Sequence, residues 1–520
     1  MKSNKNLSFL KGTISLSISV IITKILGVSF KIPLSYILGD EGMGYFNTAY
    51  AIYGFFYILC TAGVPKSLTL VLSENRANSG EKNDIQILRA GLKLFLLIGA
   101  FSSLLNIIGA PFFSRIVGNS KACLSIILVA PAILFVSLGG VLRGFMSSNE
   151  KLSVIAISQL IEGVVKLALG LLLSFVGVKN GAPIYVISAL AILGITLGSA
   201  LSFLYMLIKS NYLKQRVKDR QNITLSNKAI NKKILKSALP IALSSSLLNL
   251  SSTLDIALII RRLVESGMNE TQANAVYGNY TTLAVPMFNL VISVLSPIAT
   301  SYMPRLSFMN IKGDERGFIL SLNRLLSITL IIATPASFAF FFYGFELLDI
   351  LFSVQSSALG ADMLICLSVG LCFLSALTVV NTALESKGKI YSAVISLLLG
   401  SVVKAVASYA LISNDKLGIL GAPIGTVLSY AFSLVVSLVF LEISGVKIFA
   451  IAKMLLLALA GFIAFYLPYY MVYSTSLLGS PFNSMIFSIG ISVFAYFSLL
   501  ALGYFLFIRR SVSKLHKNVQ

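Results

Sequence analysis

Five lysines lie inside long apolar stretches of this sequence, where a charge is expensive. They are Lys24, Lys31, Lys66, Lys166 and Lys404. An ionisable side chain near the centre of a bilayer costs at least about 2.5–3.5 kcal/mol on insertion scales, so each is a functional candidate by default. Lys24 and Lys31 are seven residues apart, which places them two turns apart on one helical face. A cavity bordered by these ammonium groups would be cationic and would suit a phosphate or pyrophosphate group.

A structural role is the alternative for each of these lysines. Lys31 and Lys66 could extend their ammonium groups to the membrane surface. The other three lysines lie too centrally in their apolar stretches for that. The binding hypothesis is therefore stronger for these three.

Two carboxylates also fall inside apolar stretches. Glu162 precedes Lys166 by four residues, the favourable orientation for an ion pair within a helix, so we expect these two to pair. Such a pair would lower the insertion cost without contacting a substrate. Asp255 could bind a coupling Na⁺ or H⁺, or pair with a lysine. Arg143 and Glu385 lie near the predicted helix ends, where we expect plain solvation.

The sequence lacks the residue patterns of most catalytic and cofactor sites. Its single histidine, His516, lies in the C-terminal tail, and its four cysteines are scattered without metal-ligand spacing. It has no Walker-type glycine motif and no loop long enough for a nucleotide-binding domain. We therefore expect a protein that is not an enzyme and has no ATP-binding domain. We also expect no metal or other cofactor apart from a coupling Na⁺ or H⁺.

The elements that must position these residues are transmembrane helices. Of the 520 residues, 57% are hydrophobic and 12% are charged, whereas soluble domains are about 45–50% apolar and about 25% charged. This composition excludes a soluble protein. A bilayer core needs about 20 apolar residues per helix. Fourteen such segments can be marked, at 10–38, 44–72, 86–108, 122–147, 151–177, 183–208, 235–262, 274–303, 318–344, 362–385, 388–412, 417–441, 448–473 and 483–508. Their apolar runs do not alternate as barrel strands do, so we predict an all-α polytopic membrane protein.

The distribution of charge predicts the orientation. The 41 basic and 19 acidic residues give a formal net charge of +22, and most basic residues fall in alternate loops. The largest group lies between Lys209 and Lys236, and this bias predicts that both termini are cytoplasmic. We interpret that loop as a topology signal, with anionic-lipid binding as the alternative. We expect no nucleic-acid partner, because such binders combine basic patches with ordinary globular composition.

Two parts of the chain resemble each other. Residues 151–158 read KLSVIAIS and residues 389–396 read KIYSAVIS, and GAPI occurs at both 181–184 and 421–424. We predict two parallel six-helix lobes plus two extra C-terminal helices. The predicted parts are an N-lobe at 1–209, a basic linker at 210–234, a C-lobe at 235–442, the extra helices at 443–508 and a basic tail at 509–520. Transporters built from such repeats bind substrate between the halves, near the midplane.

Several N-terminal motifs carry a family resemblance. They are TKILG at 23–27, KIPL at 31–34, LGDEGMGY at 38–45 and AGVPK at 62–66. With these motifs, the chain resembles the stage V sporulation protein B and MurJ-like lipid II flippases. Those belong to the multidrug/oligosaccharidyl-lipid/polysaccharide (MOP) exporter superfamily. The detailed match lies in the first two spans, and the fourteen-span plan extends it over the whole chain.

The resemblance implies an alternating-access flippase for an undecaprenyl-pyrophosphate-linked saccharide. In that family, cations on the first two helices line the central cavity, and Lys24, Lys31 and Lys66 fall at the matching positions. The resemblance also implies a lipid-tail groove formed by the last two spans. Some members bind Na⁺ through an aspartate on the seventh helix, which Asp255 could match. The family often has Pro-Val-Ala where this chain has Pro-Lys-Ser, which leaves the kind of saccharide open.

We therefore expect a flippase in the bacterial cell membrane that moves a polyprenyl-pyrophosphate-linked cell-envelope sugar precursor outwards. Lipid II is the first choice of substrate and another polysaccharide precursor is the second. The expected partners are this lipid-linked saccharide and the membrane lipids. A drug/cation antiporter of the same superfamily is the main alternative, although cationic drugs favour carboxylates in a cavity. A membrane-bound glycan ligase or polymerase is a more distant one, because it needs a catalytic outer loop.

Overall fold

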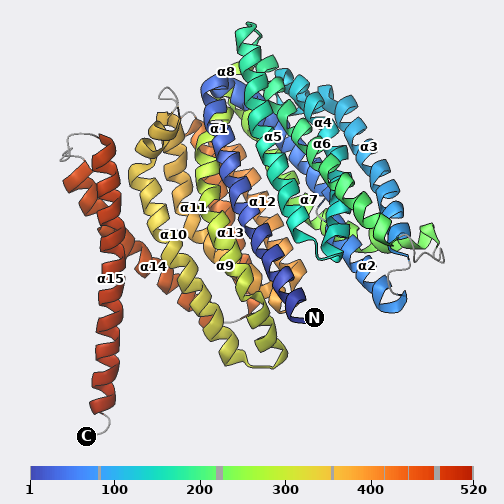
Figure 1. Ribbon diagram of the computed structural model, residues 1–520. Coiled ribbons are helices and arrows are strands. Elements are labelled where there is room, and N and C mark those ends of the chain that lie inside the picture. The colour runs from blue at the N-terminus through green and yellow to red at the C-terminus, as the bar shows by residue number, and fades with distance from the viewer. Residues whose placement is uncertain are drawn as a thin grey trace. The chain divides into compact units, whose positions relative to one another are not determined.

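The computed structural model describes most of the chain. The described ranges are 2–61, 63–79, 83–217, 226–352, 357–414, 416–442, 444–473 and 481–517. Every element within these ranges is a helix (Figure 1), so the predicted all-α class is confirmed. Contacts divide the chain into two units, Met1–Thr282 (unit 1) and Leu283–Gln520 (unit 2).

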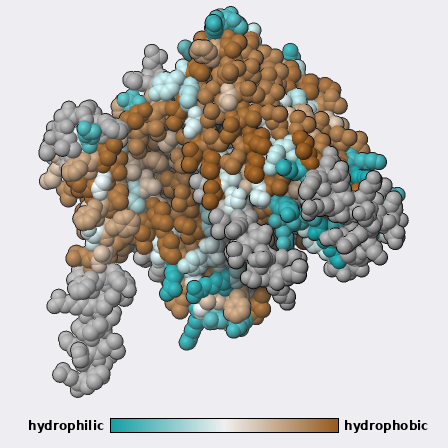
Figure 2. All heavy atoms as spheres, in the orientation of Figure 1, coloured by the Kyte–Doolittle hydropathy of each residue, from teal (hydrophilic) through white to brown (hydrophobic). Residues whose placement is uncertain are grey.

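The helices have the length and composition of membrane spans. In the described part of the chain, eleven helical segments are long and apolar enough to cross a membrane. Figure 2 shows mostly hydrophobic atoms on the described surface in view, with hydrophilic atoms gathered at the ends of helices. Each of the fourteen predicted segments falls mainly on helical residues. The protein is therefore a multi-span membrane protein, and the count of fourteen stays a prediction.

Unit 1 is built around a long first helix. Its described helices are α1 (Lys2–Thr61), α2 (Val64–Ser79), α3 (Asp84–Val117), α4 (Cys123–Ser148), α5 (Leu152–Lys179), α6 (Ile184–Val217), α7 (Asn227–Glu265) and α8 (Glu270–Asn279). Helix α1 packs against α4, α5, α6, α7 and α8, and α5 packs closely on α6. The interior of unit 1 is therefore formed around α1.

Helix α1 reverses direction at Gly39. The rings of Phe30 and Phe46 lie 5.9 Å apart, although sixteen residues of straight helix would span about 24 Å. Gly39 has φ 59° and ψ −173°, a conformation that is essentially restricted to glycine. The reversal confirms the predicted break between the first two spans. We call residues 2–38 the first half of α1 and residues 40–61 its second half.

Replacing Gly39 with alanine is expected to lower the free energy of unfolding by about 1–3 kcal/mol, because alanine must adopt this strained conformation. A Cβ at Gly39 would meet no atom within 4 Å, so the loss would report backbone strain alone. Gly54→Ala is the control, since Gly54 is helical and its Cβ also meets nothing. That change is expected to stabilise the protein by about 0.5–1 kcal/mol. Thermal unfolding in detergent measures both, and equal effects of the two changes would contradict the strain.

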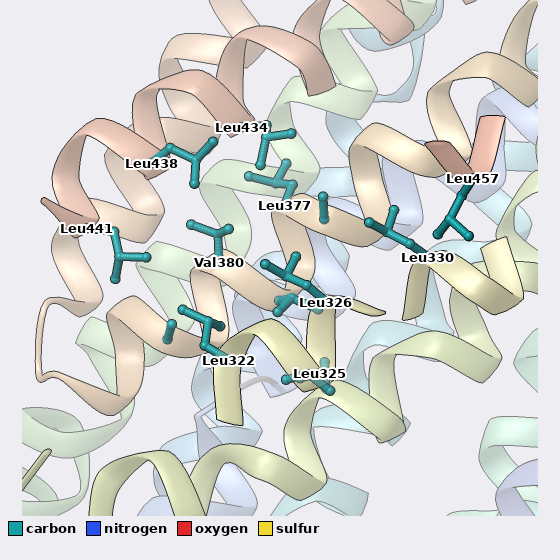
Figure 3. Close-up of a cluster of buried hydrophobic side chains, with 14 of the residues drawn as sticks. Leu322, Leu325, Leu326, Leu330, Leu377, Val380, Leu434, Leu438, Leu441 and Leu457 are labelled. Atoms are coloured by element: carbon teal, nitrogen blue, oxygen red, sulfur yellow. The ribbon is translucent and has the colours of Figure 1, made fainter. Parts of the chain in front are cut away.

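Unit 2 has a leucine-rich core. Its described helices are α9 (Val285–Ile311), α10 (Glu315–Leu351), α11 (Ser357–Ser386), α12 (Ile390–Ile412), α13 (Gly421–Leu441), α14 (Ser444–Pro468) and α15 (Pro481–Lys517). Figure 3 shows Leu326 of α10, Leu377 of α11 and Leu434 of α13 converging on one cluster. Interdigitated side chains of this kind hold membrane helices together, because lipid is as apolar as leucine and packing supplies the attraction.

The turns before α5 and α12 support the predicted duplication. Glu150 and Gly388 come directly before the two matching sequences, and both have positive φ, 58° and 78°. The amide that follows each of them donates a 2.9 Å hydrogen bond to the carbonyl five residues earlier. The two turns thus share a backbone conformation. The predicted lobe boundaries stay a prediction, since α7 and α8 group here with unit 1 by contacts.

Candidate functional site

Small residues bring α5 close to the first half of α1. A Cβ at Gly170 would lie 2.7 Å from the Phe30 ring, and one at Gly163 would lie 3.1 Å from Leu26. Glycine at such positions lets membrane helices approach each other closely. The close approach places Lys166, which lies between these two glycines on α5, against α1.

Lys31 and Lys166 meet at this contact. The Lys31 ammonium donates to Asn47 Oδ1 at 3.5 Å. The Lys166 ammonium lies 5.2 Å from the ring centroids of both Phe30 and Tyr50. The two ammonium groups are close enough for their charges to repel each other. Cation–π contacts of this kind contribute about 0.5–2 kcal/mol, which offsets part of the cost of placing Lys166 there.

Neither of these ammonium groups has a carboxylate partner in the part of the chain that the structure describes. Among the ion pairs of the described residues, none involves Lys31 or Lys166. Both side chains are half-buried. Two like charges held together away from bulk water favour the binding of an anion between them, because the anion removes their repulsion.

Glu162 pairs with Arg143 of α4, not with Lys166. The Arg143 Nη2 donates to Glu162 Oε2 at 2.9 Å. The expected pair within α5 and the expected solvation of Arg143 are both wrong. The reason is that the Lys166 ammonium lies over aromatic rings, while the long arginine side chain crosses from α4 to the carboxylate. The short connection between α4 and α5 was a signal for this pair.

A series of tyrosines lies on the second half of α1 beside these charges. Tyr50, Tyr53 and Tyr57, called here the tyrosine series, follow one another with ring centroids 6.0 and 5.6 Å apart. Tyr50 lies at the level of Lys166, and Tyr57 faces Arg143. The tyrosine series thus connects the lysine pair with the Arg143–Glu162 pair.

The remaining predicted site residues lie on several helices of the two units. Lys24 lies on the first half of α1 and is exposed. Lys66 lies on α2 and Asp255 on α7, but both side chains fall outside the described residues. Lys404 is half-buried on α12, in unit 2. Within the described part of unit 1, Lys31 and Lys166 are therefore the two predicted lysines that come together.

A second polar cluster closes the turn of α1 against α8. Asn274 of α8 donates to the carbonyl of Glu41 at 2.8 Å. Asn119 donates to the Asn274 side chain. At the crossing of the two helices, a Cβ on Gly278 would clash with the carbonyl of Asp40, and one on Gly44 would clash with Asn274. All these residues belong to unit 1, so α8 closes tightly over the turn.

The fold is that of the transporters of the MOP superfamily. It is similar to the structure described as "Lipid II flippase MurJ, inward closed conformation", with a TM-score of 0.73 and 16% identity, covering 95% of this chain and 100% of that one. It is also similar to an inward-facing multidrug resistance MATE family transporter, with a TM-score of 0.66 and 16% identity, covering 84% of this chain and 98% of that one.

The chain belongs to the polysaccharide biosynthesis protein family, whose profile matches residues 9–310. Three similar proteins are from Bacillus subtilis (strain 168). The uncharacterized membrane protein YabM is 27% identical over 425 residues, covering 81% of this chain and 77% of YabM. Stage V sporulation protein B is 23% identical over 428 residues, covering 81% of each chain. Lipid II flippase MurJ is 23% identical over 457 residues, covering 83% of this chain and 82% of MurJ. The predicted family is thereby confirmed.

Proposed function

We propose that this protein is an alternating-access flippase for an undecaprenyl-pyrophosphate-linked cell-envelope sugar precursor. It moves the precursor from the inner to the outer leaflet of the bacterial cell membrane, with lipid II as the first candidate. The observation that carries the proposal is the pair of Lys31 and Lys166, which has no carboxylate partner among the ion pairs of the described residues. The similarity to MurJ supports it.

The chemistry of the site suits a pyrophosphate headgroup. A pyrophosphate carries several negative charges and many acceptor oxygens, so it can bridge two ammonium groups with charge-assisted hydrogen bonds. The tyrosine series offers ring faces and hydroxyls beside the cations, which suit the sugar that follows the pyrophosphate. The prenyl tail stays in the lipid throughout, so no free energy is needed to move it into water.

A MATE-like drug/cation antiporter fits the same fold but fits this site less well. A cationic drug needs an available carboxylate or a negative cavity. The carboxylate beside these lysines, Glu162, is already paired with Arg143. An anionic substrate is therefore the better match for the charges of unit 1.

We further propose that the membrane potential or an ion gradient resets the cycle. Moving one charge across 100 mV corresponds to about 2.3 kcal/mol, so an empty carrier with unneutralised lysines would respond to the potential. Asp255 on α7 is the proposed site for a coupling Na⁺ or H⁺. We also propose that both termini are cytoplasmic, as the distribution of basic residues in the loops predicts.

The test is complementation of cells depleted of their lipid II flippase. Expression of this protein is expected to restore growth and the appearance of lipid II in the outer leaflet, measured by labelling lipid II accessible from outside. A protein inserted at normal levels that restores neither would exclude lipid II as substrate. Another polyprenyl-pyrophosphate-linked glycan would then be assayed in the same way.

A further inference from the structure

Arg143 is only partly satisfied in the interior of unit 1. Its Nη2 donates to Glu162, yet its Nε is buried and has no hydrogen-bond partner among the described residues. The side chain is 16% exposed and that of Glu162 is 25% exposed. A buried charged donor without an acceptor is costly, so its retention points to a partner that is present at another stage.

A second arginine of unit 1 shows what a purely structural pair looks like. Arg76 donates from Nε to Asp84 at 2.7 Å, from Nη1 to the carbonyl of Ser148 and from Nη2 to Asn149 at 3.0 Å. All three of its nitrogens have acceptors, and this network joins α2 to the start of α3 and the end of α4. Arg143 interacts with Glu162 and Tyr57, but its Nε has no acceptor among the described residues.

The position of Arg143 extends the cationic cluster along α5. Glu162 precedes Lys166 by one turn, which is about 6 Å of helix. Arg143 therefore lies on the side of Lys166 that is nearer to the start of α5, with Tyr57 facing its guanidinium. An anion moving along the tyrosine series would meet Arg143 at one end and Lys31 with Lys166 at the other.

We propose that Arg143 is a further phosphate ligand, kept occupied by Glu162 until an anionic headgroup displaces the carboxylate. The inference rests on the proposed function for the identity of that headgroup. The planar guanidinium matches a phosphate with two parallel hydrogen bonds, which an ammonium cannot do. Glu162 acts as a competitor that a singly charged anion does not displace. This competition favours pyrophosphate over monoanions such as carboxylates.

The experiment measures binding to the purified full-length protein in nanodiscs. The probes are inorganic pyrophosphate, farnesyl pyrophosphate and farnesol. Glu162→Gln is expected to tighten the Kd for both pyrophosphates about tenfold, because the competing charge is gone. Arg143→Gln is expected to weaken both about tenfold, and the double variant is expected to bind like Arg143→Gln. Asp84→Asn, which disrupts the structural pair, serves as the matched control and should leave Kd unchanged.

Arg143→Lys keeps the charge and covers the case in which Arg143→Gln does not fold. It is expected to bind both pyrophosphates more weakly than the unchanged protein, because an ammonium cannot make two parallel hydrogen bonds to a phosphate. Tighter binding of farnesyl pyrophosphate than of inorganic pyrophosphate, without binding of farnesol, identifies a lipid-borne headgroup. The reverse order identifies free pyrophosphate as the ligand of Arg143.

Three results would overturn the proposal. One is an unchanged or weaker Kd in Glu162→Gln with a lower melting temperature, which would make the pair structural. Another is that Glu162→Gln lowers the Kd for pyrophosphate equally in the presence of Arg143 and in the Arg143→Gln background, which would be a general effect of net charge. The third is no binding of either pyrophosphate. These experiments measure binding only. If the variants bind as expected but the protein does not transport lipid II, the role of Arg143 stands and lipid II is rejected as the substrate.

Discussion

Replacing Lys31 or Lys166 with methionine is expected to reduce transport of the lipid-linked saccharide about a hundredfold. Each ammonium is expected to make a charge-assisted hydrogen bond to the pyrophosphate, worth about 1.5–3 kcal/mol, and a hundredfold corresponds to about 2.7 kcal/mol. Methionine keeps the length and packing of the side chain, so the change removes charge with little change of volume. The measurement is outer-leaflet labelling of lipid II in the depleted strain, normalised to inserted protein.

The same variants are expected to have the opposite effect on stability. Lys31 and Lys166 repel each other and have no carboxylate partner among the described ion pairs. Lys31→Met is therefore expected to raise the free energy of unfolding by about 1 kcal/mol. Lys166→Met is expected to raise it less, because this change also removes the contacts of the ammonium with the Phe30 and Tyr50 rings. Arg143→Ala is expected to lower it by about 2–3 kcal/mol, because Glu162 loses its partner. A gain of stability together with a loss of transport is the signature of a binding group.

Two further variants make the lysine test specific. Lys93→Met removes an exposed lysine of α3 and is expected to leave transport unchanged. Lys166→Arg retains the charge beside the Phe30 and Tyr50 rings and is expected to keep much of the transport, since arginine also binds phosphate. Normal transport by Lys31→Met and Lys166→Met would remove both lysines from the mechanism. Equal loss in Lys93→Met would show that total charge, rather than the site, matters.

The sequence was sufficient for the fold class and for the first reversal of the chain. Apolar runs of span length allow few structures in a membrane, because only helices and closed barrels satisfy their backbone groups there. The break between residues 38 and 44 was visible as a short polar stretch containing two glycines, and Gly39 forms the turn. These features are local along the chain, so they could be predicted without knowing which helices are neighbours.

The partners of the charged residues could not be predicted in the same way. The four-residue spacing correctly placed Glu162 and Lys166 on the same face of α5. It could not show which side chains of α4 and α1 lie against that face. Arg143 reaches Glu162 from α4, and Phe30 with Tyr50 receives the Lys166 ammonium from α1. Such pairings depend on rotation and depth of packed helices, and the side chains of several helices compete for each partner. The tyrosine series was missed for the same reason, although its three-and-four spacing was present in the sequence.

Replacing Gly278 with valine is expected to separate α8 from the turn of α1 and to reduce transport about a hundredfold. A Cβ at this position would clash with the backbone of Asp40 and Gly44, and a backbone cannot move aside as a flexible side chain can. The hydrogen bond from Asn274 to Glu41 is expected to break as the helices part. The Asn279 amide nitrogen donates to the Asp40 carboxylate at 3.4 Å. Two cysteines introduced at these positions would therefore be cross-linked by a short bifunctional reagent, and loss of this cross-link in Gly278→Val reports the separation.

The effect is expected to be this large because we expect α8 to close over the turn of α1 in one state of the proposed cycle and to leave it in another. An alternating-access carrier works only if both end states can form, and packed interfaces switch between discrete arrangements instead of deforming gradually. A valine that forbids one arrangement therefore stops the cycle even when the protein folds and its lysines still bind pyrophosphate. Gly54→Val is the matched control, because a Cβ there meets no atom within 4 Å. Retained cross-linking and transport in Gly278→Val would show that this closure is not required, and loss of pyrophosphate binding would place the defect in folding instead.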